Sequence, residues 1–367
     1  MRIKQIDLFQ LNYKLLDEKY SWSRGNYVES FLTNIVKITT DENIIGFGEV
    51  CTLGSAYLPA FAKGVPSGLE EIGKHLIGKN PLEIKLINQI MDLHLLGHNY
   101  IKSPIDVACW DILGKASNQP ICTLLGGRMV DEFPLYRAIP QRSPQEMNED
   151  VLKYQSEGYT KFQLKVGGEP DVDIQRIKKV AEVMRPGDVL IADSNTGWTA
   201  AGAIRIANSC SDLDVYIEQP CLTLNECLTV REHTNLPMVL DEIIVGIHEL
   251  VEANKSRAMD VVNIKISRVG GLTKAKQMRD YCESAGIMMT LEDSWGGDIA
   301  TAAIAHFVGS TRPDYYFSST DFNSYNDVSV STNAPRRKNG RLAVPTSHGL
   351  GIDVDEKILG LPILTIK

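Results

Sequence analysis

The first third of the chain changes from strand-like alternation to helical periodicity. Apolar and polar residues alternate in IKQIDLFQLNY and VESFLTNIVKITTDENIIGFGEV, which predicts a meander over residues 1–50 with TTDEN as a turn. Apolar residues then recur every three or four positions in GLEEIGKHLIGKN, PLEIKLINQIMDLHLLGH and SPIDVACWDILGKASN, a spacing typical of amphipathic helices. Residues 1–125 therefore predict an α+β domain.

From about residue 133 short apolar strands alternate with amphipathic helices, a pattern typical of βα units around a parallel sheet. The strand candidates are FPLYRAI, YTKFQLKVG, DVLIADSN, LDVYIEQP, LPMVLDE, MDVVNIKISR, IMMTLED and YYFSSTD. A set of this size favours a closed barrel. We expect the barrel to cover residues 126–324, and the tail 325–367, which ends in strand-like LPILTIK, to complete the first domain.

A charged residue ends each of several successive strand candidates. These residues are Lys165, Asp193, Glu218, Asp241, Lys265 and Asp293, with steps of 28, 25, 23, 24 and 28 residues. Such steps fit one βα unit each, and the carboxyl ends of all barrel strands face one mouth. The six side chains are therefore expected to converge there.

The three acids on consecutive strands, Asp193, Glu218 and Asp241, predict a metal site. Carboxylates held this close repel one another unless a cation lies between them, and an all-oxygen ligand set suits Mg²⁺. The alternative is that each acid caps the following helix, a position in which Asp and Glu are favoured. The occurrence of all three between two lysine-bearing strands favours the metal.

Lys165 and Lys265 fall on the second and sixth strands and are expected to face each other across the mouth. Burial and a nearby dication disfavour an ammonium, so such a lysine could act as a base. A cation that chelates a carboxylate would stabilise the enediolate formed when the neighbouring carbon loses its proton. The residues thus predict proton abstraction alpha to a carboxylate. The alternative is a pair of structural lysines that neutralise the acids.

Composition excludes several classes of partner. The formal net charge of −8 gives no basic surface for nucleic acid or anionic membranes. The first residues lack the apolar run of a signal peptide, so we expect a cytoplasmic protein. The seven cysteines are scattered without C-x-x-C spacing, which indicates neither a disulfide framework nor a zinc site.

These motifs resemble the muconate-lactonizing-enzyme subgroup of the enolase superfamily. The resemblance extends over the whole chain, since GFGEV and SPIDVACWDILGK are similar to that family's capping domain. It implies a modified (β/α)7β barrel with an α+β capping domain, Mg²⁺ as the cofactor and a homo-oligomer. One position departs from the pattern, because Gln163 stands where the family usually has the first lysine of K-x-K. In the family that lysine is thought to lower the basicity of its neighbour, and Lys165 matches the second, catalytic position.

Further segments are most similar to family members that dehydrate cis-3-hydroxy-L-proline, and hydroxyproline betaine 2-epimerases are near relatives of these. The segments are SWSRG, CTLGSAYLP, KFQLKVGG, DSNTGWT, YIEQPC, KISRVGGL and EDSWGGDIATAA. The resemblance implies a small proline-derivative substrate, loss of water to give pyrroline-2-carboxylate, and competing 2-epimerisation. The alternative activity is racemisation or epimerisation of proline betaine, hydroxyproline betaine or another N-substituted amino acid. Cycloisomerases, sugar-acid dehydratases and a non-catalytic binding module fit less well.

The same resemblance implies substrate contacts. Asp293 and Asp321 would pair with a ring ammonium, and Trp295 would form an apolar wall. The loop residues expected to close over the substrate are Trp22, Ser23 and Tyr57. A helix cap for Asp293 and ordinary packing for Trp295 and the loop aromatics remain the alternatives. A betaine would instead require an aromatic cage, for which strand eight offers Tyr315, Tyr316 and Phe317.

Overall fold

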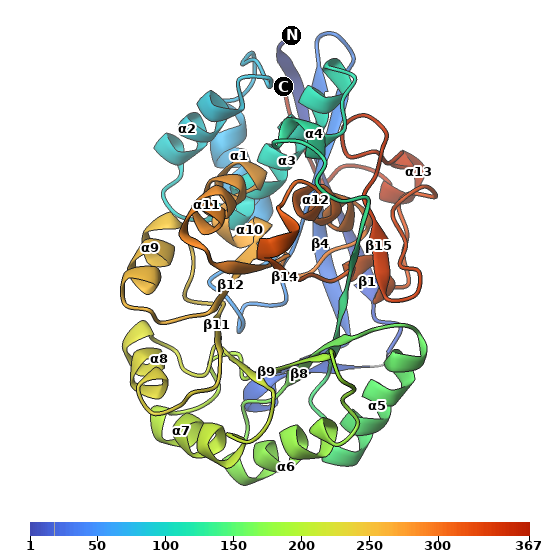
Figure 1. Cartoon of the computed structure of the whole chain (residues 1–367). Helices are drawn as coiled ribbons and strands as arrows, with labels where there is room; N and C mark the ends of the chain where they lie inside the picture. The colour runs from blue at the N-terminus through green and yellow to red at the C-terminus, as the bar shows by residue number, and fades with distance from the viewer. Residues whose placement is uncertain (18) are drawn as a thin grey trace.

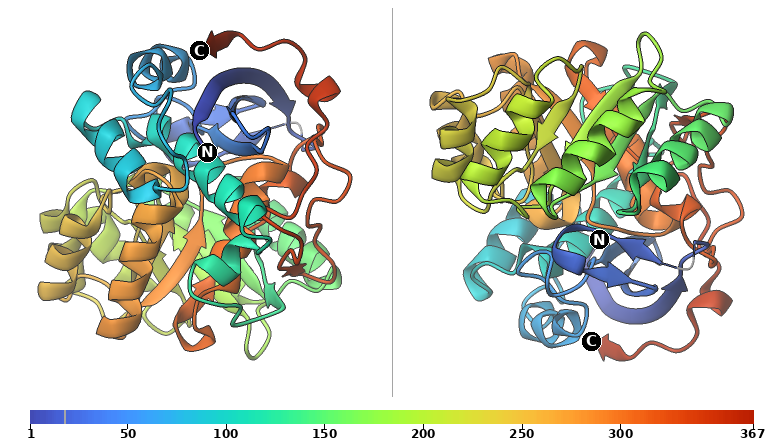
Figure 2. Two further views of the ribbon diagram at one scale, coloured as in Figure 1. Left: turned by 90° about the horizontal axis from the view of Figure 1, so that it is seen from above. Right: turned by 90° about the horizontal axis from the view of Figure 1, so that it is seen from below.

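An antiparallel sheet of four strands covers one side of a parallel sheet of eight strands in the computed structural model, which describes residues 1–17 and 19–367 (Figure 1). The antiparallel sheet has the order β16-β1-β4-β5. Its strands are β1 (Ile3–Lys14), β4 (Ser30–Thr40), β5 (Ile45–Cys51) and β16 (Leu364–Ile366). The last strand of the chain thus pairs with the first, and both termini lie on this sheet (Figure 2).

The predicted meander forms a sheet that is buried on both faces. In β1, Ile6 and Leu8 on one face and Tyr13 on the other are completely buried and belong to the main core. A short hairpin and helices accompany the sheet: β2 (Tyr20–Ser21), β3 (Tyr27–Val28), α1 (Gly64–Gly73), α2 (Ile84–His94), α3 (Asn99–Ala116) and α4 (Ile121–Leu124). Gly48 of β5 allows close packing on α3, because a Cβ there would lie 1.9 Å from the carbonyl oxygen of Pro104.

The parallel sheet runs in sequence order from β7 to β14. Its strands are β7 (Tyr136–Ile139), β8 (Lys161–Lys165), β9 (Val189–Asp193), β10 (Tyr216–Glu218), β11 (Met238–Leu240), β12 (Val261–Lys265), β13 (Met288–Glu292) and β14 (Tyr316–Ser318). The edge strands meet where the amide of Tyr136 donates to the carbonyl of Ser319 at 2.7 Å. The predicted fold class, a (β/α)7β-type barrel with an α+β capping domain, is confirmed.

Helices surround the barrel (Figure 2). They are α5 (Pro144–Ser156), α6 (Pro170–Ala181), α7 (Ala200–Ser209), α8 (Leu224–Arg231), α9 (Ile247–Lys255), α10 (Ile266–Val269), α11 (Leu272–Ala285) and α12 (Asp298–Gly309). Local sequence fixes some of their starts, since Ser143 with Glu146 and Thr223 with Glu226 form capping boxes. None of the helices in the described part of the chain is long and apolar enough to cross a membrane.

The segment FPLYRAI forms two strands instead of one. Its first half is β6 (Glu132–Pro134), which pairs with β15 (Arg341–Ala343) outside the barrel, and only the second half enters the barrel as β7. The remaining short helix of the tail is α13 (Glu356–Leu359). The domain limits of 1–125, 126–324 and 325–367 stay a prediction.

A buried carboxylate joins the capping sheet to the barrel. Glu49 of β5 accepts hydrogen bonds from the amides of Gly297 and Ala300 at 2.9 and 3.0 Å, at the start of α12. It also accepts from Tyr13 Oη and Thr33 Oγ1 at 3.0 and 2.8 Å. The carboxylate therefore satisfies helix N-terminal donors and fixes the loop that leads from β13 into α12.

Candidate active site

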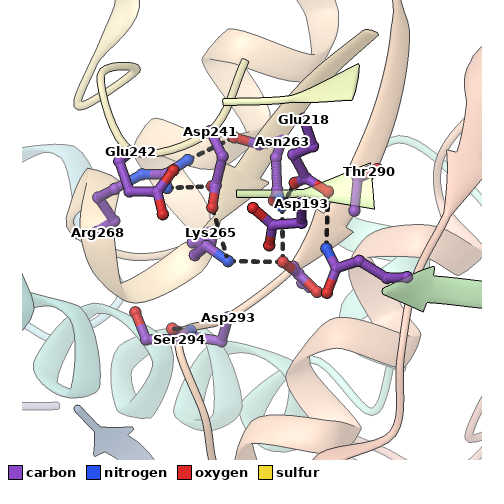
Figure 3. A network of polar contacts seen from close by, with 12 residues as sticks. Asp193, Glu218, Asp241, Glu242, Asn263, Lys265, Arg268, Thr290, Asp293 and Ser294 are labelled. Atoms are coloured by element: carbon purple, nitrogen blue, oxygen red, sulfur yellow. Dashed lines mark hydrogen bonds and ion pairs between the residues drawn. The ribbon is translucent and has the colours of Figure 1, made fainter. Parts of the chain in front are cut away.

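Strand register brings the predicted charged residues together at one end of the barrel. Lys165 pairs with Asp193, and Asp193 with Glu218, as direct neighbours on β8, β9 and β10. Asp241 follows β11 and Lys265 ends β12, and Figure 3 shows both beside Asp193 and Glu218. All five side chains are buried. The parallel strands therefore bring these residues together at one end of the barrel, as their spacing in the sequence predicts.

Each lysine is ion-paired with acids at the mouth. Lys165 Nζ lies 2.5 Å from Asp193 Oδ2, and Lys265 Nζ lies 2.7 Å from Glu292 Oε1 and 3.3 Å from Asp241 Oδ2. Burial lowers the pKa of both lysines, but the surrounding acids outweigh it and hold each pKa above its usual value. The predicted lowering of these pKa values therefore requires a cation that neutralises the acids.

The three acids fit a divalent cation by their chemistry. Burial raises the pKa of Glu218 well above its usual value, and the neighbouring charges of Asp193 and Asp241 raise it further. Lys265 and Arg268 outweigh burial and lower the pKa of Asp241 to about 2. Buried oxygen donors on three consecutive strands match the ligand preference of Mg²⁺. A bound dication would remove the repulsion on Glu218.

Other side chains contact two of these acids. Asp193 accepts from Lys165, and Asp241 accepts from Tyr57 Oη at 3.0 Å. Asp241 also pairs with Arg268 (Figure 3). No group of three acidic, histidine or cysteine side chains within residues 1–17 and 19–367 is already arranged to hold a metal. Metal binding therefore requires Asp193 and Asp241 to exchange contacts with cationic side chains for contacts with the ion.

Glu292 is a site residue that the sequence pattern does not predict. It lies opposite Lys265 in strand register and accepts from Lys265 Nζ, from Asn263 Nδ2 at 2.7 Å and from the hydroxyl of Tyr136. The charge spacing points to its neighbour Asp293 instead. The available signal is the two-residue alternation of a strand, which puts Glu292 on the same face as Thr290.

The carboxylate of Asp293 is engaged with backbone and side-chain donors. It accepts from the amide and hydroxyl of Ser267 and from the amide of Ser294 at 2.6 Å. Burial raises its pKa to about 7. The residue lines the central cavity, and its carboxylate is engaged by Ser267 of α10 and by the next amide of its own chain. Its role as an ammonium partner stays a prediction.

Asp321 lies outside the residues that line the cavity. Burial raises its pKa to about 6, against the lowering effect of Arg137 and Arg337. In the described part of the chain neither carboxylate oxygen has a hydrogen-bond partner. The structure therefore does not bring Asp321 together with the two lysines.

The predicted lid and wall residues divide into two groups. Trp295 and Tyr57 line the cavity together with Tyr20, which the sequence does not single out. Trp295 stacks on Phe31 with ring centroids 4.4 Å apart. Trp22 is buried beside Tyr20 and does not line the cavity.

Ser23 is buried next to the barrel mouth, and its hydroxyl donates to the carbonyl of Asn195 at 3.3 Å. It contacts a strand end and not the cavity. The strand-eight aromatics are also elsewhere: Phe317 packs on Tyr216 in a separate apolar cluster, and Tyr316 Oη donates to the carbonyl of Pro134 at 2.6 Å. Tyr315 packs against the main core instead. An aromatic cage for a betaine is therefore not formed by strand eight.

A small cavity lies between the two lysines. It has a volume of about 20 Å³, which is room for a single water. The residues that line it are Tyr20, Leu53, Tyr57, Tyr136, Ala138, Gln163, Lys165, Lys265, Glu292, Asp293, Ser294, Trp295, Thr320, Phe322 and Tyr325. Leu53 and Tyr57 place the loop after β5 on the wall of this cavity.

Known proteins resemble the chain along its full length. A family model described as enolase C-terminal domain-like matches residues 146–358. The model of the mandelate racemase/muconate lactonizing enzyme N-terminal domain matches residues 25–126. Cis-3-hydroxy-L-proline dehydratase from Roseibium aggregatum is 54% identical over 363 residues, 99% of this chain and 99% of that protein.

A more distant relative is N-succinyl-L-Arg/Lys racemase from Bacillus cereus, 31% identical over 316 residues and 85% of each protein. Among solved structures, a mandelate racemase/muconate lactonizing enzyme from Roseovarius nubinhibens complexed with magnesium has a TM-score of 0.97 and 29% identity. That alignment covers 100% of both chains. The fold thus occurs with magnesium in a full-length homologue.

Proposed function

This chain belongs to the mandelate racemase/muconate lactonizing enzyme family of the enolase superfamily, and from that premise we propose that it dehydrates cis-3-hydroxy-L-proline with Mg²⁺. The observation that carries the proposal is the 54% identity, over 99% of both chains, to a dehydratase of that substrate. The product is pyrroline-2-carboxylate. The buried acids and paired lysines of the barrel mouth support the same chemistry.

We assign the metal to Asp193, Glu218 and Asp241, whose carboxylates supply oxygen ligands on three consecutive strands. When bound, Mg²⁺ supplies the positive charge that stabilises an enediolate as the alpha proton leaves. Asp193 and Asp241 each contact a lysine. Metal binding therefore weakens the charge pairs that hold these lysines as ammonium ions.

Lys165 and Lys265 line the cavity from strands two and six of the barrel. In the substrate the alpha hydrogen and the 3-hydroxyl lie on opposite ring faces, so elimination needs a base and an acid on opposite sides. One amine takes the alpha proton, the carbon–oxygen bond at C3 breaks, and the other ammonium protonates the departing hydroxide to water. The enamine that results tautomerises to pyrroline-2-carboxylate. By analogy with the superfamily we assign the base to Lys165.

The alternative function is racemisation or epimerisation of a proline betaine or another N-substituted amino acid. It uses the same two lysines and returns the proton to the opposite face without loss of water. The 31% identity to an N-succinyl amino acid racemase favours this as the second candidate. A substrate with no leaving group separates the two activities.

The test is proton NMR in deuterium oxide with Mg²⁺ and three separate substrates: cis-3-hydroxy-L-proline, L-proline betaine and 4-hydroxyproline betaine. Dehydration predicts loss of the first substrate with appearance of pyrroline-2-carboxylate, and no product when EDTA replaces Mg²⁺. Alpha-deuterium exchange on a betaine alone would replace the dehydratase by the epimerase. Absence of reaction with all three would reject both assignments.

We further propose a cytoplasmic homo-oligomer that takes a small proline derivative and binds neither nucleic acid nor membranes. All seven cysteines are buried and free, which suits a reducing compartment. The acidic net charge of −8 is unfavourable for polyanionic partners. Light scattering coupled to gel filtration measures the oligomeric state, and a monomer at micromolar concentration would contradict it.

A further inference from the structure

We propose that Gln163 determines substrate specificity by accepting a hydrogen bond from the ring N–H of the bound amino acid, an inference that rests on the proposed function. Gln163 is 2% exposed and lines the cavity between the lysines. It lies on β8 two residues before Lys165, so both side chains point to the same side of the strand. A group at this position therefore faces the cavity between the lysines.

The contacts of Gln163 orient its amide. The Nε2 atom donates to Glu218 Oε2 at 2.8 Å. The carbonyl oxygen Oε1 is thereby the free end of the side chain. No donor within residues 1–17 and 19–367 hydrogen-bonds to it.

The carboxylates that line the same cavity are already engaged. Glu292 accepts from Lys265, Asn263 and Tyr136, and Asp293 accepts from serine donors. A secondary ring ammonium brings two N–H donors that need acceptors once they leave water. Gln163 Oε1 offers one without breaking an existing contact.

The neutral amide also matters for charge. A lysine at this position would add a third ammonium beside Lys165 and Lys265 and repel a cationic amine. A betaine nitrogen carries methyl groups and no N–H, so it gains nothing from Oε1. Gln163 therefore favours a secondary amine over its N,N-dimethyl counterpart.

The test compares binding of L-proline and L-proline betaine by calorimetry in saturating Mg²⁺. Both ligands carry the same carboxylate, so altered metal affinity affects them equally and the ratio of their affinities isolates the N–H contact. Gln163→Met, which lacks an acceptor, should lower the proline-to-betaine ratio about tenfold. Gln163→Glu, which keeps an acceptor, should retain or raise it, and either variant that folds is informative.

Asn263→Ala is the matched control, because Asn263 also donates to Glu218, at 3.1 Å, but does not line the cavity. The ratio of L-proline affinity to L-proline betaine affinity in Asn263→Ala should equal that of the wild type. A wild type that does not prefer L-proline, or a Gln163→Met ratio within twofold of the wild type, overturns the proposal. Turnover of cis-3-hydroxy-L-proline by the wild type is measured separately, so a shifted ratio without turnover rejects the dehydratase assignment but not the Gln163 contact.

Discussion

At the residue scale, the two site lysines compete with a cation for the same carboxylates. Lys165 Nζ lies 2.5 Å from Asp193 Oδ2. Replacing Lys165 by Met should reduce turnover by about 10²–10⁴-fold, the usual contribution of a general acid or base. The same change should tighten Mg²⁺ binding, because Asp193 is released from its ion pair. NMR assays measure the first effect and calorimetry the second.

Lys161→Met is the control for this variant, since Lys161 begins the same strand and does not line the cavity. Its Mg²⁺ affinity should equal that of the wild type. Unchanged Mg²⁺ affinity in Lys165→Met would show that Asp193 is not a ligand, or that its ion pair does not oppose the metal.

A buried histidine makes stability depend on pH. His306 Nδ1 accepts from the amide of Cys122 at 3.2 Å, and Nε2 contacts the carbonyl of Leu350 at 2.9 Å, so the neutral ring satisfies both. Burial lowers its pKa from 6.5 to about 4. The unfolded chain thus binds the proton first as pH falls, and stability is lost between about pH 6.5 and 4.

The histidine contribution amounts to about 3 kcal/mol from that shift. His306→Gln should flatten the pH dependence of the free energy of unfolding in this window, while other titrating groups act equally in both proteins. Urea unfolding at several pH values measures the difference between the two proteins. Parallel curves would contradict the assignment.

The site also shows which residues a sequence can reveal. The spacing predicts that Lys165, Asp193 and Glu218 converge, because strand register converts a repeat near 25 residues into proximity. It selects Asp293 and misses the adjacent Glu292, with which β13 ends. The choice between them depends on where the strand stops, which tertiary packing decides.

At the element scale, strand-eight aromatics illustrate the same limit. The sequence pattern predicts β14 but not the position of its residues along the barrel axis. Phe317 packs on Tyr216 beneath the mouth and does not reach the site. The division of FPLYRAI into β6 and β7 has a related cause, since pairing with β15 comes from residues two hundred positions away and leaves no local signal. Hydrophobic pattern thus defines strands better than it defines their ends.

The contact between β5 and α12 gives a prediction at this scale. Glu49 accepts from Gly297 and Ala300 with separate carboxylate oxygens, so Glu49→Gln presents an amide donor to one backbone donor. The free energy of unfolding should fall by about 1–3 kcal/mol. KM should rise as well, because the same loop carries Trp295, which lines the cavity.

Urea unfolding and steady-state kinetics test the Glu49 variant. Glu71→Gln is the control, since the Glu71 side chain is 57% exposed and forms a surface ion pair with Lys74. It should leave both quantities unchanged. An unchanged free energy of unfolding with a raised KM would show that Glu49 positions the loop without stabilising the contact between the capping sheet and the barrel. If neither the free energy of unfolding nor KM changes, both roles of Glu49 are refuted.

At the scale of the whole molecule, the barrel concentrates unfavourable charge at its mouth. Glu218 is buried and Asp193 and Asp241 raise its pKa further, so the ionised form costs stability at neutral pH. Functional sites often contribute unfavourably to the free energy of folding, because the arrangement that activity needs is not the most stable one. The capping sheet and surrounding helices supply the packing that tolerates it.

This argument predicts opposite effects of one substitution in two solutions. In EDTA, Glu218→Gln should raise the melting temperature by roughly 1–2 °C, equivalent to about 1 kcal/mol, because one of three repelling charges is gone. In the wild type, Mg²⁺ at about 100 times its Kd should stabilise the fold by about 2.7 kcal/mol. Glu218→Gln should lose most of that gain. Scanning calorimetry with and without Mg²⁺ measures both, and an undiminished Mg²⁺ shift in the variant would remove Glu218 from the ligand set.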